Sequence, residues 1–322
     1  MKTIQVSVLL WILCILQCFG QSKINRLPVI DMHLHVYTPQ NYRGGSDVQF
    51  RDTLLESPAD QSGHMEAVIQ QINKYNIVIT YASGSYAALD IINKKHPGLF
   101  LSSAEIWPTR DLLSDINFID KLKSKIENGE VRGIGEVVNF YTGIAPNDPV
   151  LDTLYKIAED NDLPIGLHFA PGPPGSQQSY YPNMRLEYGN PLMIQDVLIK
   201  FPKLRLNIMH AGLPIFKDET FGILLMFPNV YVDISAQCWY CDYTKEILDD
   251  FLIKSIQYGF GDRIMFGSDE MNWPGTIGLS IDYINNADFL TEKQKRDILY
   301  NNAAKFLRLT EDEIKKHHQN SK

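Results

Sequence analysis

Short, nearly continuous runs of apolar residues alternate with longer stretches of helical spacing along most of the chain. Eight such runs predict buried strands, at residues 27–35, 77–82, 99–105, 131–138, 164–169, 205–210, 230–234 and 264–268. The stretches between and after them predict helices near 60–75, 84–95, 111–127, 149–161, 190–201, 216–227, 243–258 and 291–308. Strands with little polar alternation suit a sheet that is buried on both faces. Eight β–α units of this kind predict a (β/α)8 TIM barrel rather than an open doubly wound sheet.

The first twenty residues follow a different pattern, in which Lys2 precedes a continuous apolar core at residues 6–16. The segment ends with Cys18-Phe19-Gly20, so small residues occupy the −3 and −1 positions of a cleavage site before Gln21. This arrangement is typical of a secretory signal peptide and predicts a periplasmic or secreted protein. An uncleaved membrane anchor is the alternative, but the apolar run is short for a span and its flanks lack strong charge. Lipid attachment at Cys18 is disfavoured because Gln17 before it is bulky and polar.

Removal of this segment leaves about 300 residues, which suits one barrel domain over residues 21–322. The composition is that of a globular protein, with 44% hydrophobic and 21% charged residues. The formal net charge is −8, and it becomes −9 when Lys2 leaves with the segment. An acidic chain without a basic, aromatic-rich patch argues against nucleic acid as a partner. We therefore expect a small-molecule substrate and no stable membrane span after cleavage, and we leave assembly into homo-oligomers open.

Two cysteines remain outside this segment, in the motif Cys238-Trp239-Tyr240-Cys241. The pair does not open a helix of a thioredoxin-like βαβ unit, and a zinc ribbon needs a second pair that the sequence lacks. We interpret the two residues as a local disulfide or as two packed thiols.

Side chains that bind metals or move protons follow the ends of the predicted strands. The carboxyl ends of all strands in a barrel meet at one mouth, so residues far apart in sequence are expected to lie together there. Asp31-Met32-His33-Leu34-His35 closes the first strand, and the i, i+2 spacing lets both imidazoles reach one cation. The other strand ends contribute Glu105, Glu136, His168, His210, Asp233 and Asp269. Four histidines with several carboxylates can hold one or two divalent ions.

These motifs, in this order, resemble the metal-dependent amidohydrolase superfamily, and most closely its amidohydrolase-related (amidohydrolase 2) branch. The matching pieces span nearly all of residues 28–309 and are Asp31-Met32-His33-Leu34-His35, Gly135-Glu136, Leu167-His168, Met209-His210-Ala211-Gly212, Phe266-Gly267-Ser268-Asp269 and Asn301-Asn302-Ala303-Ala304-Lys305-Phe306-Leu307. The resemblance implies that a catalytic metal is ligated by four residues, His33, His35, His168 and Asp269. It implies that His210 ligates a second ion or polarises the substrate. The chain departs from the branch after Asp269, where Glu270-Met271-Asn272-Trp273-Pro274 replaces an aromatic residue and proline directly following the aspartate.

Glu136 leaves the number of ions open. Some members of the superfamily bridge two ions with a glutamate of the fourth strand, whereas many members of the amidohydrolase-related branch bind one ion without such a carboxylate. Glu136 therefore either bridges two ions or holds a neighbouring side chain or the substrate. Zinc suits these nitrogen and oxygen donors, and manganese is the alternative.

The expected activity is hydrolysis by a metal-activated water, because a bound divalent ion lowers the pKa of water to about 7. We expect cleavage of a lactone, ester or amide bond in a small organic or sugar-derived substrate. Asp269 would move the proton, and the metal or His210 would stabilise the oxyanion. The mouth loops carry Trp107, Tyr181 and Arg185 as candidates for substrate contact, with Arg185 facing a substrate carboxylate. The alternatives are a metal-dependent nonoxidative decarboxylase, a TatD-like phosphoesterase and a noncatalytic metal- or solute-binding protein.

Overall fold

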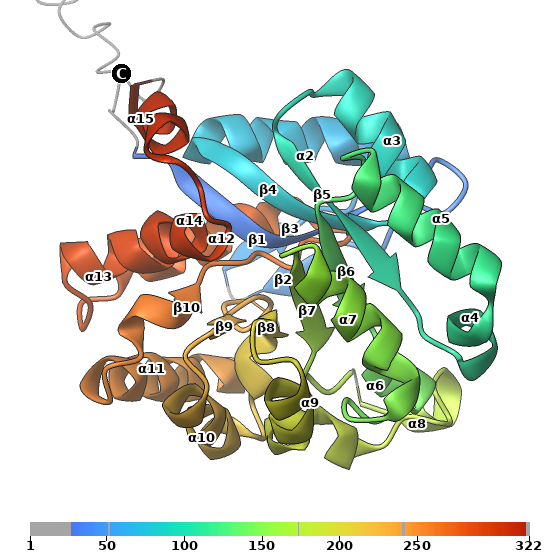
Figure 1. The fold of residues 1–322 in the computed structure, drawn as a ribbon. Helices are drawn as coiled ribbons and strands as arrows, with labels where there is room; N and C mark the ends of the chain where they lie inside the picture. The colour runs from blue at the N-terminus through green and yellow to red at the C-terminus, as the bar shows by residue number, and fades with distance from the viewer. Residues whose placement is uncertain (1–26, 51, 173, 240–241, 320–322) are drawn as a thin grey trace, which may run out of the picture.

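A computed structural model describes residues 27–50, 52–172, 174–239 and 242–319, so the expected signal segment lies outside the described residues. Its main sheet has eight strands in the order β1-β4-β5-β6-β7-β8-β9-β10, and each neighbouring pair is parallel (Figure 1). The strands are β1 (Val29–Val36), β4 (Ile77–Gly84), β5 (Phe100–Ile106), β6 (Gly133–Val137), β7 (Pro164–His168), β8 (Arg205–Met209), β9 (Val230–Asp233) and β10 (Ile264–Met265). The structure confirms all eight predicted strands, and the last one is shorter than expected.

The barrel is nearly closed by contacts between β1 and the segment that follows β10. The backbone N of Met32 donates to the carbonyl of Phe266 at 3.0 Å, and that of His35 donates to the carbonyl of Glu270 at 2.9 Å. Because β10 ends at Met265, these bonds are made by non-strand residues beyond it. The closing segment thus runs along the part of β1 that carries the candidate metal ligands.

Helices form an outer layer around the strands (Figure 1). They include α2 (Gln61–Tyr75), α3 (Tyr86–Lys95), α4 (Arg110–Ser114), α5 (Ile116–Glu127), α7 (Asp152–Asp160), α9 (Gln195–Lys200), α10 (Lys217–Met226), α11 (Asp242–Gln257), α12 (Gly275–Asn286), α13 (Glu292–Arg296) and α14 (Asn302–Phe306). The single helix expected over 111–127 is wrong. Asp115 separates α4 from α5 because its carboxylate accepts from the backbone N of Asn117 and so caps a new helix. Within the described ranges, no helix is long and apolar enough to cross a bilayer.

Several elements fall outside the predicted pattern. They are the antiparallel hairpin of β2 (Val48–Phe50) and β3 (Thr53–Leu55), the short helices α6 (Asn139–Thr142) and α8 (Ser176–Ser179), helix α12, and the C-terminal α15 (Glu311–Gln319). Helix α12 packs closely on α2, since a Cβ at Gly278 would lie 2.8 Å from the Tyr75 hydroxyl oxygen. Contact between α12 and α2 therefore closes the layer of helices, as the contacts between β1 and the segment after β10 close the ring of strands.

Alternation along β1 separates its apolar side chains from its candidate ligands. Ile30 and Met32 pack in an apolar cluster with Tyr300 of the C-terminal helical region. Since successive side chains of a strand point to opposite faces, this packing directs His33 and His35 to the other face. The core thereby fixes the orientation of both imidazoles.

Candidate metal centre

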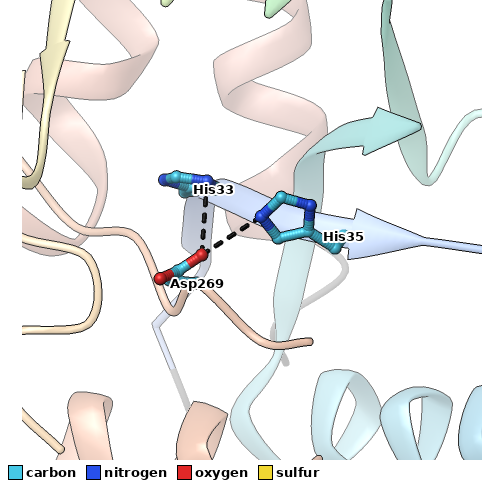
Figure 2. Close-up of side chains that lie close together, drawn as sticks. All are labelled: His33, His35 and Asp269. Carbon is cyan, nitrogen blue, oxygen red and sulfur yellow. Dashed lines mark hydrogen bonds and ion pairs between the residues drawn. The ribbon is translucent and has the colours of Figure 1, made fainter. Parts of the chain in front are cut away.

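A first group of candidate ligands consists of His33, His35 and Asp269, all of them buried. Figure 2 shows both imidazoles on one strand and the Asp269 carboxylate reaching them from the segment after β10. The Oδ1 atom of Asp269 lies 3.4 Å from His33 Nε2 and 3.2 Å from His35 Nε2. Two imidazole nitrogens and one carboxylate oxygen therefore meet at one place, which suits a divalent ion such as zinc.

The local backbone explains how Asp269 reaches the histidines. Its amide N donates to the carbonyl of His33 at 2.7 Å, and its φ of 54° lies in the left-handed region that non-glycine residues seldom adopt. Gly267 permits the close approach, because a Cβ there would lie 2.9 Å from the His33 Cβ and 3.0 Å from the Ser235 Cβ. The small residues before Asp269 therefore place its carboxylate beside β1.

Asp31 holds the same two segments together from the interior. Its Oδ1 accepts from the backbone N of His33 at 3.1 Å and from that of Ser268 at 2.9 Å. Burial raises the pKa of Asp31 to about 7, although these hydrogen bonds act in the opposite direction. Asp31 therefore supports the ligand-bearing backbone and does not belong to either candidate ligand group.

A second group consists of Glu136 on β6, His168 at the end of β7 and His210 directly after β8. Oε1 of Glu136 lies 2.6 Å from His168 Nδ1 and 3.2 Å from His210 Nε2. The two ring nitrogens are 3.1 Å apart. Three potential donor atoms thus converge at the ends of three strands, as the barrel topology predicts. His33 also lies close enough to Glu136 and His210 for these three residues to hold one ion, so His33 can serve either group.

Glu136 lies between the two groups. Its Oε1 is 3.8 Å from His33 Nε2, and its Oε2 is 3.7 Å from His35 Nε2. Its backbone N donates to Ser83 Oγ at 3.0 Å, which helps to fix this position. One carboxylate therefore contacts both groups, the arrangement needed to bridge two ions held a few ångströms apart.

The Nε2 atom of His33 tests whether these residues fit a metal. This atom is buried and makes no hydrogen bond to any part of the chain that the structure describes. Leaving a buried polar atom without a partner is costly, and coordination of a cation would satisfy it. The cluster of nitrogen and carboxylate oxygen donors around it fits zinc or manganese.

The carboxylates control the charge of the imidazoles. Burial alone would lower the pKa of His35, but its hydrogen bond to Asp269 and the nearby negative charges outweigh burial and raise the pKa to about 10. Burial is likewise outweighed at His210, where the hydrogen bond to Glu136 helps to raise the pKa to about 9. The pKa of Glu136 lies well below its ordinary value, because His168 and His33 overcome the effect of burial. Without a metal, the cluster therefore holds protons that a cation would displace.

The two remaining acids at strand ends have other contacts. Glu105 accepts from the indole Nε1 of Trp107 at 2.6 Å. Asp233 is fully buried and accepts from the backbone N of His210 at 3.1 Å and from Asn207 Nδ2 at 2.7 Å. Neither acid belongs to the two ligand groups.

The predicted substrate residues Trp107 and Tyr181 form an aromatic group with Tyr141, which sequence reasoning missed. The Trp107 ring stacks on Tyr141 and Tyr181 with centroid separations of 6.0 and 5.9 Å. The Tyr141 ring centroid lies 4.8 Å from that of His168. Tyr141 follows the predicted strand 131–138 by three residues, so its position near a strand end was the signal that could have found it.

Arg185 makes its contacts within its own loop. Its Nη1 donates to the carbonyl oxygens of Pro182 at 2.9 Å and Met184 at 2.8 Å. Its role in binding a substrate carboxylate stays a prediction.

A buried pair behind Asp269 was also missed. Nε2 of His64 on α2 lies 2.9 and 3.0 Å from the two carboxylate oxygens of Glu270, and both residues are fully buried. Glu270 also pairs with Leu34 in the parallel bridge that closes the barrel. The pair therefore ties α2 to the segment that carries Asp269.

The cysteine motif is described only in part. Cys238 is buried, and burial raises the pKa of its thiol to about 12. Cys241 lies outside the described residues, so a disulfide or thiol pair stays a prediction.

A sequence model described as amidohydrolase matches residues 30–309, a range that contains both ligand groups. The chain belongs to the amidohydrolase family. No curated protein matches this amidohydrolase chain.

Solved structures share the fold of this amidohydrolase at low sequence identity. An uncharacterised TIM-barrel protein from Bordetella bronchiseptica is 17% identical, with a TM-score of 0.63 over 88% of this chain and 99% of that one. A probable 2-pyrone-4,6-dicarboxylic acid hydrolase from Acinetobacter baumannii, with citric acid bound, is 14% identical, with a TM-score of 0.59 over 87% and 99%. A dihydroxybenzoic acid decarboxylase from a Polaromonas species, with bound manganese and the inhibitor 2-nitroresorcinol, is 13% identical, with a TM-score of 0.57 over 88% and 97%. At these identities the likeness establishes the barrel fold.

Proposed function

We propose that this amidohydrolase is a metal-dependent hydrolase that holds two divalent ions, zinc or manganese, and cleaves a lactone, ester or amide bond. The substrate is a small organic or sugar-derived molecule. The position of Glu136 carries the proposal, because one oxygen faces His35 while the other faces His168 and His210. When bound, a divalent ion lowers the pKa of water to about 7 and polarises a carbonyl.

The residues of the chain divide the proton and charge transfers between them. Burial would raise the pKa of Asp269, but the charge of His33 and the hydrogen bond from His35 lower it, so the carboxylate stays ionised. It can take the proton of the attacking water and return it to the leaving group. His210 Nε2, beside Glu136, would serve as a ligand of the second ion, which would supply positive charge near the substrate oxygen.

The aromatic group of Trp107, Tyr141 and Tyr181 supplies apolar surface for the rest of the substrate. Trp107 is 42% exposed although its ring stacks on two tyrosines. It therefore offers a ligand an exposed aromatic surface whose orientation is fixed by the two tyrosine rings. Aromatic faces of this kind pack against cyclic substrates.

A substrate panel on zinc- or manganese-loaded protein tests this function. It would contain a neutral lactone, an ester, an amide, a phosphoester and an aromatic acid, with carbon dioxide measured for the acid. Metal-dependent hydrolysis of one of the first three supports the proposal. Phosphoester cleavage alone would favour a TatD-like enzyme, and metal binding without any turnover would favour a binding protein.

A nonoxidative decarboxylase is the second candidate. The Tyr141 ring beside His168, with the Trp107 ring stacked on it, would suit a flat aromatic acid, and similar barrels include decarboxylases of such acids. Release of carbon dioxide without hydrolysis on the same panel would favour this reaction over the proposed one.

We also propose export, with residues 1–20 as the signal peptide. The apolar core followed by a small-residue cleavage site supports this proposal. Expression of the full chain followed by N-terminal sequencing should give a protein that begins at Gln21 in the periplasm or medium. A cytoplasmic protein that retains Met1 would contradict export.

A further inference from the structure

Ser235 lies directly behind the candidate metal centre and touches both groups. Its Oγ is 2.9 Å from His33 Nδ1 and 3.0 Å from His210 Nδ1, and it also bonds to Oδ1 of Asp233. In both histidines the opposite ring nitrogen, Nε2, faces the carboxylates of the centre. One fully buried hydroxyl therefore contacts one imidazole of each group.

Asp233 determines the direction of the hydroxyl. Its Oδ1 accepts from the backbone N of His210 and of Ser235, both at 3.1 Å, and its Oδ2 accepts from Asn207 Nδ2 at 2.7 Å. A carboxylate surrounded by donors in this way acts as an acceptor, so the Ser235 hydroxyl donates its single proton to it.

The donor and acceptor capacity of the Ser235 hydroxyl then determines which ring nitrogen of His33 and of His210 carries a proton. A serine hydroxyl has one proton and two lone pairs. With the proton given to Asp233, the contacts from His33 and His210 must both be accepted by the oxygen. Each Nδ1 therefore carries a proton.

A second contact leads independently to the same result for His210. Its Nδ1 also lies 3.2 Å from the backbone carbonyl oxygen of Ser235, which can only accept. A lone pair on this Nδ1 would face two acceptors, whereas an N–H can donate to both.

His168 has the opposite arrangement. Its Nε2 lies 2.7 Å from the carbonyl oxygen of Ala170, so that nitrogen carries the proton. Its Nδ1 is the atom that faces Glu136. A metal ion held at Nδ1 would therefore leave His168 with its proton on Nε2, the tautomer opposite to that of His33 and His210.

We propose that Asp233 and Ser235 form a shared positioning pair that accepts hydrogen bonds from Nδ1–H of both His33 and His210, and so keeps the proton on Nδ1 and aims both Nε2 lone pairs into the centre. A histidine that ligates a metal commonly donates its other ring N–H to a partner that fixes the tautomer and the ring orientation. Here a single hydroxyl serves two ligands on different strands, so the two ion positions are coupled through Ser235. The inference rests on the proposed metal centre and is independent of the substrate.

Long-range proton–nitrogen NMR of the histidine rings tests the pair directly, on the whole protein with and without zinc. We expect slowly exchanging Nδ1–H signals for His33 and His210 in both states. With zinc bound, His168 should instead carry its proton on Nε2. Ser235→Ala should make the two Nδ1 protons exchange faster and leave the His168 signal in place. An unprotonated Nδ1 on His33 or His210 in the unaltered protein would overturn the proposal.

Metal titration provides the second readout. Loss of an outer hydrogen-bond partner commonly weakens metal binding by about 10- to 100-fold. We expect Ser235→Ala to weaken binding of both ions by this factor. The matched control is Ser255→Ala in α11, because that buried hydroxyl donates to the Phe251 carbonyl within its own helix. Unchanged affinity for both ions in a folded Ser235→Ala protein would contradict the coupling. A protein that binds no zinc would overturn the proposed function, while the protonation of Nδ1 would still be measured.

Discussion

Glu136 Oε1 lies 2.6 Å from His168 Nδ1, so adjacent strands β6 and β7 share a buried polar contact at the mouth of the barrel. The other oxygen of the same carboxylate is 3.7 Å from His35 Nε2 on β1. Sequence separation hides this relationship, which exists because the barrel brings the ends of its strands to one place. We therefore expect substitution of Glu136 to remove the contact that links the two ligand groups.

Replacement of Asp269 by asparagine should lower kcat by about 10²- to 10⁴-fold, because the amide cannot take the proton of the attacking water. We expect a much smaller change in KM. Metal content measured on the same sample separates loss of proton transfer from loss of a ligand. Asp262→Asn is the control, since this exposed carboxylate pairs with Lys305 on the surface. A variant with near-normal kcat would exclude the proposed role of Asp269.

Zinc binding should release protons and strengthen as the pH rises. Without metal the pKa of His35 is about 10 and that of His210 about 9, so both imidazoles are protonated at neutral pH. A ligating nitrogen must lose its proton, and binding is therefore weaker below these values. Calorimetry at pH 7.5 in buffers of different ionisation enthalpy should show release of about two protons per chain. Binding heats that do not depend on the buffer would contradict this charge state.

Removal of the His64 imidazole should destabilise the fold. His64→Ala leaves the buried Glu270 carboxylate without its partner on α2. Removal of one partner of a buried pair that contains a carboxylate costs about 3–5 kcal/mol of the free energy of unfolding. Urea denaturation should show this loss, and the double variant His64→Ala/Glu270→Gln should recover part of it because no charge stays buried. A single variant within about 0.5 kcal/mol of the unaltered protein would show that the pair contributes no stability.

Trp107 should act on substrate binding rather than on the chemical step. Trp107→Ala removes the outer ring of the aromatic group, and a loss of about 1.4 kcal/mol would raise KM about tenfold with little change in kcat. Trp107→Phe should retain part of the affinity. Tyr180→Ala is the control because its side chain is 77% exposed. Equal effects of the Trp107 and Tyr180 variants would argue against a specific aromatic contact.

The sequence contains enough information to predict the barrel and most of the candidate ligands. Apolar runs mark the strands because a parallel sheet is buried on both faces, and the i, i+2 spacing places His33 and His35 together. The convergence of Glu136, His168 and His210 then follows from the topology. The roles of these residues are predictions that the measurements described above test.

Other features depend on three-dimensional contacts that no local pattern encodes. The partner of Glu270 is His64, more than 200 positions earlier, and the sequence alone offers no reason to join them. Asp233 follows a strand and has the same local pattern as a ligand, but its donors come from His210, Asn207 and Ser235 rather than from a cation position. Helix α12 could have been predicted, because Ile277, Ile281 and Ile284 follow helical spacing, whereas its contact with Tyr75 of α2 at Gly278 could not.

The most direct test of the account is the number of metal ions per chain, measured by elemental analysis of the zinc-reconstituted protein and of Glu136→Gln. Glu105→Gln is the matched control, because it removes a carboxylate at the mouth that belongs to neither ligand group. The account predicts two ions in the unaltered protein and in Glu105→Gln, and one ion in Glu136→Gln. A content of one ion per chain in the unaltered protein, unchanged in Glu136→Gln, would contradict the two-ion centre.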